Sequence, residues 1–348
     1  MSKELALSSK LVNLSEIILS LSSSMICRVG FGKRYDEKGD EKRRFHKLLR
    51  DAEAVLGDFF VSDFFPIFGW VDKVNGKGAR LEKIYNELDL FYQELIEEHL
   101  SPTRPKSMDG DILDTLIVLR DQTLSSSLIL TWDHIKAVLM DVFIAGTDTT
   151  AAAVVWAMTA LMKEPKAMKK LQENIRELVG KKGRVDEDDI QKLPYLKAVI
   201  KETLRLYPPA PLLLPRETIE KCNIDGYEIQ PNTLVFFNAW SIGRDPECWK
   251  NPEEFIPERF CSSVTSNDID VDYKSVEFEM VPFGGGRRGC PGISLGVATV
   301  ELALANLLYA FDWELPFGMV KQDIDTNTLP GLTMHKKIPL CLVAKFYD

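Results

Sequence analysis

The sequence predicts a mostly α-helical protein with a small β portion late in the chain. Across the first two-thirds, apolar residues recur at intervals of three and four, which is the period of an amphipathic helix. After Pro211 the pattern changes to turn residues and short β-branched runs. Because the helical and strand parts interleave, we expect one domain over residues 1–348.

Several helices can be placed from this spacing and from the residues at their ends. A long apolar stretch begins after Thr131, a suitable N-cap, and stops before Pro165. It is apolar on most of its circumference, so it should run through the centre of the fold. Further helices are predicted at 79–100, 168–178 (followed by Gly180 as a C-cap), 195–206 and 293–310.

The β portion is predicted from turn chemistry and residue type. Asp225-Gly226 inside 222–229 is a two-residue hairpin signal. The runs 233–237 and 338–346 are rich in β-branched, aromatic and aliphatic residues, so both are expected to be strands.

Composition excludes some classes of function. The net charge of -9 argues against a nucleic-acid partner, since phosphate binding needs a basic excess. The six cysteines are spread without tight pairs, which favours a reducing compartment over a disulfide scaffold. No signal peptide is recognised, and the most hydrophobic stretch contains Asp141 and Asp148, so no transmembrane anchor is expected in this chain.

The stretch FGGGRRGCPG, residues 283–292, places Cys290 just before the helix predicted at 293–310. A thiol there experiences the positive end of the helix dipole, which favours the thiolate. The glycines allow close approach of something flat, and Arg287 and Arg288 could pair with its carboxylates. Haem fits these requirements. The alternative is a glycine-rich surface turn with an inert cysteine.

Two further stretches could carry chemistry. Glu202 and Arg205 share a helix face, and Arg259 in PERF could join them in a charged cluster, or they could form an ordinary surface ion pair. AGTDTT at 145–150 puts polar groups into the most apolar helix. It is either a kink whose threonines bond to the backbone, or an opening where a carboxylate and a hydroxyl relay protons.

Together these motifs carry a family resemblance. Phe283, Gly286, Arg288, Cys290 and Gly292 fit the pattern F-x-x-G-x-R-x-C-x-G. With Glu202-x-x-Arg205, PERF and AGTDTT in the expected order, nearly the whole chain resembles the cytochrome P-450 haem-thiolate monooxygenases. It is most similar to the plant microsomal A-type group, lacking the N-terminal part.

The resemblance implies a cytochrome P-450 fold, N-terminally truncated, with haem b as cofactor and Cys290 as the iron ligand. Phe283 would pack beneath the haem by the thiolate, and Gly286 and Gly292 would also bind the cofactor. Arg288 and Arg216 would meet the propionates. Asp148 and Thr149 would steer protons to dioxygen. The structural cluster would be Glu202, Arg205 and Arg259. The substrate pocket would be lined by Phe143, Ala145, Gly146, Ala210, Leu212, Leu213, Leu332 and Thr333.

The resemblance also implies partners and a location. Full-length relatives lie on the cytosolic face of the endoplasmic reticulum membrane and take electrons from an NADPH-cytochrome reductase. The membrane anchor, the first helices and an early helix with a W-x-x-x-R pattern are expected to be missing, so this chain could be cytosolic or peripheral.

The expected function is insertion of one oxygen atom from O2 into an apolar small molecule, such as a terpenoid, phenylpropanoid, aldoxime or alkaloid. The alternative is a truncated, non-catalytic family member that binds haem poorly or not at all. A cysteine-nucleophile hydrolase is disfavoured, because no motif brings one of the four histidines to Cys290.

Overall fold

The computed structural model describes residues 11–33, 40–104, 110–123, 129–261 and 278–347. They are mostly helical with a small β portion, which confirms the predicted fold class. Contacts group the chain into two compact units, one of Met1–Ile18 with Thr149–Asp348 and the other of Leu19–Asp148. The helices α1 (Leu14–Phe31) and α7 (Trp132–Lys163) each continue from one unit into the other. The expectation of a single domain stays a prediction.

The unit of Leu19–Asp148 is helical and is built around an aromatic core. The ring centroids of Phe45 and Phe143 are 4.4 Å apart, and Phe31 and Phe91 pack around them. Besides parts of α1 and α7, its elements are α2 (Asp40–Leu56), α3 (Val61–Phe64), η2 (Pro66–Phe68), α4 (Trp70–Val74), α5 (Lys77–Leu100) and α6 (Ile112–Thr123).

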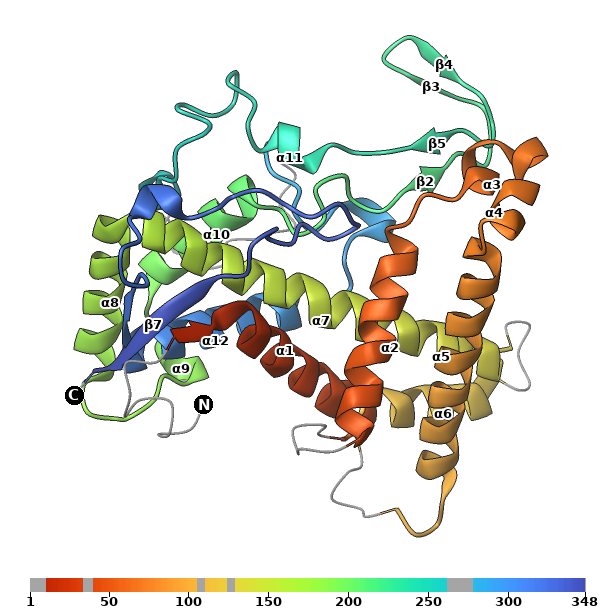
Figure 1. The fold of residues 1–348 in the computed structure, drawn as a ribbon, viewed down its shortest axis with the longest axis horizontal. Coiled ribbons are helices and arrows are strands. Elements are labelled where there is room, and N and C mark those ends of the chain that lie inside the picture. The colour runs from red at the N-terminus through yellow and green to blue at the C-terminus, as the bar shows by residue number, and fades with distance from the viewer. Residues whose placement is uncertain (1–10, 34–39, 105–109, 124–128, 262–277, 348) are drawn as a thin grey trace. The chain divides into compact units, whose positions relative to one another are not determined.

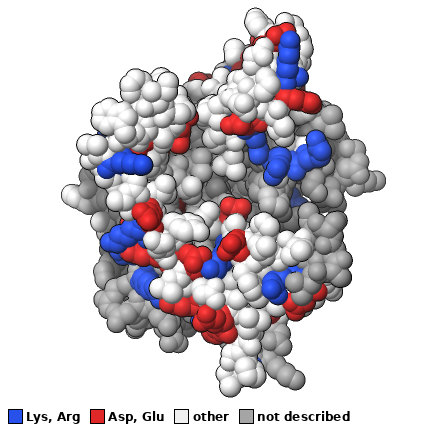
Figure 2. Space-filling view, turned by 90° about the vertical axis from the view of Figure 1, so that its right-hand side faces the viewer, with Lys and Arg blue, Asp and Glu red and all other residues white. Residues whose placement is uncertain are grey.

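Helices α2 and α5 lie side by side in this unit (Figure 1). Exposed ion pairs join them, including Arg44 with Glu94 and Lys47 with Glu87. On the face shown in Figure 2, acidic and basic side chains are interspersed. Such exposed pairs contribute little to stability, so the apolar core is what holds the two helices together.

The other unit combines helices with short antiparallel strands. Its helical elements are α8 (Pro165–Val179), α9 (Glu187–Ile190), α10 (Pro194–Leu206), α11 (Ala239–Ile242), η4 (Pro257–Phe260), η6 (Gly286–Arg288), α12 (Ile293–Ala310) and η7 (Lys321–Asp323). Its strands are β1 (Leu11–Asn13), β2 (Arg216–Glu217), β3 (Cys222–Ile224), β4 (Tyr227–Ile229), β5 (Leu234–Val235), β6 (Phe311–Glu314) and β7 (Cys341–Phe346).

These strands form three antiparallel groups. The order β1-β7-β6 makes a three-stranded sheet, with Leu11 opposite Val343 and Trp313 opposite Ala344. β2 pairs with β5, and β3 pairs with β4 as a thin hairpin (Figure 1). The hairpin turn uses Asp225 at φ 51° and Gly226 at φ 84°, the left-handed conformation that the Asp-Gly signal predicts.

The predicted helices are close to the observed ones. The N-terminus of α7 is capped as expected, since the backbone N–H of His134 donates to Thr131 Oγ1 at 3.3 Å. Gly180 ends α8 at φ 56°, and α12 spans the residues predicted for it. The predicted strand at 233–237 is shorter in the structure, because β5 pairs with β2 over only two residues.

Among the described residues, three helices are long and apolar enough to cross a membrane: α1, α7 and α12. The bent pair Lys47–Phe64 with Pro66–Val74 would raise this to four. The expectation of no transmembrane segment rested on Asp141 and Asp148, both of which lie within α7. Most of the apolar window of α7, 61%, is buried inside the protein.

Candidate active site

The loop around Cys290 is shaped by glycines in a conformation that other residues rarely adopt. Gly284 and Gly286 have φ values of 66° and 67°, where a Cβ atom would be strained. The chain then makes the short helix η6 and turns back, so that the backbone N–H of Cys290 donates to the carbonyl oxygen of Phe283 at 2.9 Å. The loop therefore closes on itself between Phe283 and Cys290.

Cys290 is exposed at the start of α12. Helix α12 begins at Ile293 with Gly292 as its N-cap, and the Cys290 Sγ lies 3.9 Å from the point where a Cβ on Gly292 would be. The thiol is thus at the N-terminal end of an 18-residue helix and open to a ligand. Phe283, which precedes Cys290 in the chain, is half-buried, and Arg288 is exposed.

The segment after α10 lies against this loop. Arg216 Nη2 donates to the carbonyl oxygen of Arg288 at 3.0 Å. A Cβ on Gly284 would meet Leu213 Cδ1 at 3.6 Å. The structure therefore brings together the two arginines predicted to meet haem propionates and one residue of the predicted substrate pocket, Leu213.

A second loop from the C-terminal part of the chain joins the same segment. The backbone N–H of Met334 donates to the carbonyl oxygen of Pro209 at 2.8 Å. Pro209 directly precedes a turn in which the backbone N–H of Leu213 donates to the carbonyl oxygen of Ala210 at 3.1 Å. Leu332 and Thr333 precede Met334 and are half-buried, as Ala210 is, while Leu212 is 46% exposed. The predicted pocket residues at 210–213 and 332–333 thus lie on two adjoining loops.

Glu202, Arg205 and Arg259 meet in the structure, which sequence spacing alone could not show. Arg205 and Glu202 are both fully buried and form a bidentate pair, with Nε–Oε2 and Nη2–Oε1 distances of 2.8 Å. Arg259 Nε donates to Glu202 Oε1 at 3.0 Å. The indole of Trp249 lies over both guanidinium groups, at 5.2 Å from Arg205 and 5.9 Å from Arg259.

The remaining donors of this cluster are satisfied by backbone carbonyl groups. Arg205 Nη1 donates to the carbonyl oxygens of Gly243 (2.6 Å) and Pro252 (2.7 Å), and Nη2 donates to that of Glu254 (3.0 Å). All five N–H groups of the Arg205 guanidinium are therefore used. Glu202 Oε1 also accepts the backbone N–H of Ile256 at 2.8 Å. The cluster fixes the loops after α11 to helix α10.

Gly243 is part of this cluster and was missed by sequence reasoning. A Cβ at Gly243 would lie 2.5 Å from the carbonyl oxygen of Arg205, a distance that real Cβ atoms do not show. The glycine therefore permits close approach of the two backbones. Its sequence context, Ser-Ile-Gly-Arg, gives no signal of this role.

Gly146 in AGTDTT serves a tight helix contact. A Cβ there would lie 2.7 Å from Ile26 Cδ1 on α1. Beside it, Ser22 Oγ donates to the carbonyl oxygen of Thr147 at 2.8 Å. Because Gly146 has no side chain, α1 can approach α7 closely. The neighbouring Ala145 is exposed. A role for these two residues in opening a groove for substrate stays a prediction.

Phe143 is also committed to packing. It is fully buried, with its ring against those of Phe45, Phe31 and Phe91. The contact between Phe143 and substrate that the resemblance implies stays a prediction as well.

The two residues expected to relay protons follow one another on α7. Asp148 is buried at 4% exposure and Thr149 is half-buried. The charge of Asp148 acts on the carboxyl group of Glu53 on α2. Burial raises the pKa of Glu53 to about 8, and the charge of Asp148 adds to this rise. Glu53 was missed because no spacing rule links residues on separate helices.

The pattern W-x-x-x-R, expected to be missing together with an early helix, does occur later in the chain. Arg244 follows Trp240 by four residues and lies over its ring at 4.1 Å. Its guanidinium donates to the carbonyl oxygen of Leu206 at 2.5 Å and to Glu253 at 3.2 Å. This arginine is therefore engaged in holding the end of α10.

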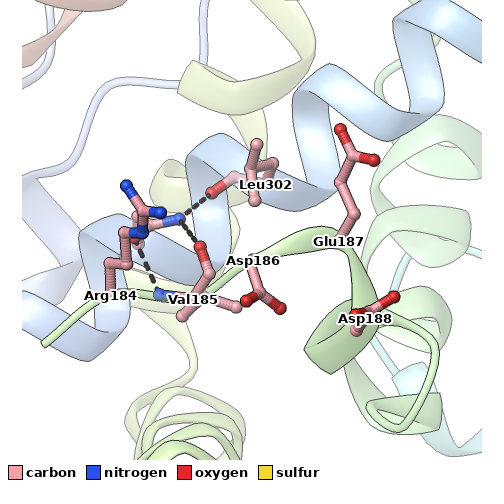
Figure 3. A pocket seen from close by; sticks show the side chains of 7 residues that line it. Arg184, Val185, Asp186, Glu187, Asp188 and Leu302 are labelled. Atoms are coloured by element: carbon pink, nitrogen blue, oxygen red, sulfur yellow. Dashed lines mark hydrogen bonds between the residues drawn. The ribbon is translucent and has the colours of Figure 1, made fainter. Parts of the chain in front are cut away.

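Two other groups of polar residues were considered as sites. A shallow cavity of about 510 Å³ is lined by residues 184–188 with Leu302 and Asn306 of α12 (Figure 3). There the amide of Asn306 exchanges hydrogen bonds with the backbone of Val185, so its polar groups serve the fold.

His99, Asp111 and Asp114 also gather within metal-ligand distance of one another. Arg104 lies among them and pairs with Asp114 and, at 2.6 Å, with Asp111. His99 Nε2 is 2.9 Å from Asp111 Oδ2. The guanidinium satisfies both carboxylates, so these residues form an ionic network that holds the segment between α5 and α6.

Comparison with known proteins decides the family. The family model described as Cytochrome P450 matches residues 1–342. This chain is a cytochrome P450. It is 54% identical to a 5-OH-xanthotoxin synthase of Pastinaca sativa over 99% of its own length and 67% of that protein. It is 48% identical to cytochrome P450 71A1 of Persea americana, over 96% of the chain and 66% of the relative.

More distant relatives agree with this assignment. A strychnine-11-hydroxylase of Strychnos nux-vomica is 46% identical over 98% of the chain and 66% of that enzyme. A zebra fish cytochrome P450 solved with progesterone superimposes with a TM-score of 0.78 at 22% identity, over 99% of this chain and 73% of that one. The cytochrome P450 fold and membership of a plant family of haem-dependent monooxygenases are therefore confirmed. The chain spans about two-thirds of the length of these plant relatives.

Proposed function

We propose that this chain carries the catalytic core of a haem-thiolate monooxygenase that inserts one oxygen atom from O2 into an apolar plant metabolite. The observation that supports it most is the exposed Cys290 thiol, held by glycine turns at the start of α12 with Arg216 and Arg288 beside it.

The residues present suit haem b. The iron needs a thiolate that the haem can reach. Cys290 is exposed, whereas Cys27 is buried in a setting that raises its thiol pKa far above the usual range. The porphyrin face needs a surface without bulky side chains, and a Cβ at Gly285 or Gly286 would meet nothing within 4 Å. The donor set and the loop therefore fit the group that the family binds.

Each residue then has a task. When bound, haem supplies the one-electron and dioxygen chemistry. Cys290 would hold the iron, and the guanidinium groups of Arg216 and Arg288 would pair with the propionates. The Asp148 carboxyl and the Thr149 hydroxyl would hold and pass protons. Half-buried apolar residues such as Leu213 and Leu332 would exclude water from the substrate.

We infer coumarin-type aromatics as the first substrate class to test. Four relatives at 51–54% identity carry names that describe hydroxylated coumarins or xanthotoxin derivatives. Terpenoids, aldoximes and alkaloids form the comparison panel, since a strychnine hydroxylase is 46% identical.

An NADPH-cytochrome reductase is the proposed electron donor, and the endoplasmic reticulum membrane is the proposed location. Support for membrane contact comes from exposed apolar side chains in η2 and α4. Ile67 is 88% exposed, and Trp70 and Val74 are 60% and 78% exposed. Exposed apolar surface of this kind is typical of membrane or protein contact, and Trp suits the interface.

Turnover with isotopically labelled dioxygen tests the proposal. The chain, the reductase, NADPH and a coumarin should give a product that contains one labelled oxygen atom, and Cys290→Ala should give none. A chain that retains haem and yields no product with any coumarin would contradict the substrate class. A chain that retains no haem would instead support the non-catalytic alternative.

A further inference from the structure

Trp156 of α7 is the largest side chain that is fully buried in the described part of the chain. It follows Thr149 by seven residues, so both residues lie on one face of α7. Ala152 lies between them on this face and forms a small buried cluster with Trp156 and Met334. The face of α7 that carries Thr149 therefore continues into a contact with the segment around Met334.

That segment is the turn of a short hairpin, residues 327–337. The chain folds back on itself there, since the backbone N–H of Leu329 donates to the carbonyl oxygen of His335 at 2.9 Å. Leu332 and Thr333, two residues of the proposed substrate pocket, lie in the turn. The two arms are joined by an isolated β-bridge, and a hairpin with so little strand pairing has marginal stability by itself. The turn therefore takes its position from the residues that it packs against.

Trp156 holds this hairpin against two other elements. Its indole N–H donates to the carbonyl oxygen of Met334 at 2.6 Å in a buried setting, and the ammonium group of Lys336 lies 4.9 Å from the centre of its ring. Tyr207, directly after α10, stacks on the indole with ring centroids 4.4 Å apart and planes 5° apart. The backbone N–H of Met334 donates to the carbonyl oxygen of Pro209 at 2.8 Å. One indole thus joins α7, the hairpin and the segment after α10.

These contacts leave the indole little freedom. A buried tryptophan N–H needs an acceptor, and Met334 supplies it through its backbone, so the indole and the hairpin turn are fixed to one another. The two loops that Trp156 joins carry the proposed pocket residues 210–213 and 332–333. A misplacement of a reacting group by about 1 Å can slow an enzyme by about 100-fold, so the position of these loops bears directly on which substrate atom reacts.

We propose that Trp156 is a positioning residue that sets the regioselectivity of oxygen insertion, by fixing the turn of hairpin 327–337 against the segment after α10. This inference rests on the proposed function, in which residues 210–213 and 332–333 line the substrate pocket. Trp156 acts through the backbone of Met334 and not by contact with the substrate.

Trp156→Phe tests this role, and Trp313→Phe is its matched control. The first variant keeps an aromatic ring for Tyr207 and removes the N–H that holds Met334. Trp313 is also buried, and its indole N–H donates to the carbonyl oxygen of Leu307 at 3.0 Å, in a part of the unit that supplies no residue to the proposed pocket. Each variant loses one buried hydrogen bond, so chemical denaturation should show similar losses of stability in the two.

The first readout is amide hydrogen exchange of the full chain, which needs neither haem nor substrate. Peptides that cover residues 327–337 should exchange about fivefold faster in Trp156→Phe than in the parent, because a hydrogen bond that restrains the hairpin is lost. In Trp313→Phe these peptides should exchange at the rate of the parent.

The second readout is the ratio of hydroxylated isomers that the haem-loaded chain forms from one coumarin with the reductase and NADPH. Trp156→Phe should change this ratio by about threefold or more, whereas Trp313→Phe should leave it unchanged. A residue that only stabilises the fold would alter the amount of active enzyme and not the ratio. Tyr207→Leu, which keeps the Trp156 N–H and removes the ring stacked on it, should change the ratio in the same direction and decides the question if Trp156→Phe does not fold.

The possible results are distinct. Parent-like exchange of residues 327–337 in Trp156→Phe would overturn the claim that Trp156 holds the hairpin. An unchanged isomer ratio in Trp156→Phe and Tyr207→Leu, or an equal change in Trp313→Phe, would overturn the role in regioselectivity. A chain that forms no product refutes the proposed function and with it this role, while the exchange result still decides whether Trp156 holds the hairpin.

Discussion

The Glu202 cluster and the Cys290 loop belong to the same compact unit, yet they use polar groups in opposite ways. In the cluster, Arg205 and Glu202 are fully buried, and every N–H of the Arg205 guanidinium has an acceptor. In the loop, Cys290 is exposed, and the backbone passes through two glycines at positive φ.

This difference indicates that the cluster serves the stability of the fold and that the loop serves the binding of a ligand. Removing a buried charge from water is costly, and only complete pairing makes it tolerable. Such a network is rigid and offers nothing to a ligand. An exposed thiol on a conformationally demanding loop contributes little to stability, so its arrangement is better explained by what it binds. The cluster should therefore control folding, and the loop should control haem.

The largest effect is expected from breaking the cluster. Arg205→Leu leaves the Glu202 carboxylate buried without its bidentate partner and frees three backbone carbonyl groups, so it should reduce the free energy of unfolding by about 3–5 kcal/mol. Chemical denaturation measures this loss. The control is Glu228→Ala in the exposed pair Lys221–Glu228, which should change stability little. Equal effects at the two sites would contradict a special role for the cluster.

A smaller effect is expected from crowding the same cluster. Gly243→Ala places a Cβ against the carbonyl oxygen of Arg205 and should cost about 1–3 kcal/mol in unfolding free energy. Gly285→Ala is the matched control, because its Cβ would meet nothing within 4 Å and its φ of −153° suits any residue. Thermal unfolding of both variants would show whether the distinction holds.

The smallest effect on stability should come from the loop. Gly286→Ala forces an alanine to φ 67° in open space, at a cost of about 1 kcal/mol. Its effect on haem retention should be larger than its effect on unfolding, since the loop presents Cys290. A variant that loses stability but keeps normal haem occupancy would contradict this division between cluster and loop.

Sequence predicted the parts of this site that lie close together in the chain. The helix that follows Cys290 could be placed because Gly292 precedes a continuous apolar run, and the turn at Asp225-Gly226 follows from the conformations these residues permit. Because Glu202 and Arg205 share a helix face, the sequence indicated that they could pair. It left open whether they form a charged cluster with Arg259 or an ordinary surface ion pair.

What the sequence could not supply depends on contacts between distant segments. The short length of β5 is set by its partner β2, and β propensity carries no information about the partner. The charge of Asp148 acts on Glu53, and Gly243 approaches Arg205, only because separate elements pack together. No local pattern records either interaction.

The central claim is that Cys290 presents a thiolate ligand to haem. The most direct measurement is the absorbance spectrum of the purified, reduced chain with carbon monoxide, compared with those of Cys290→Ala and Cys248→Ala, a second exposed cysteine. A strongly red-shifted Soret band in the parent and in Cys248→Ala, absent from Cys290→Ala, is the predicted result. A band that survives in Cys290→Ala, or its absence from the parent, would contradict the claim.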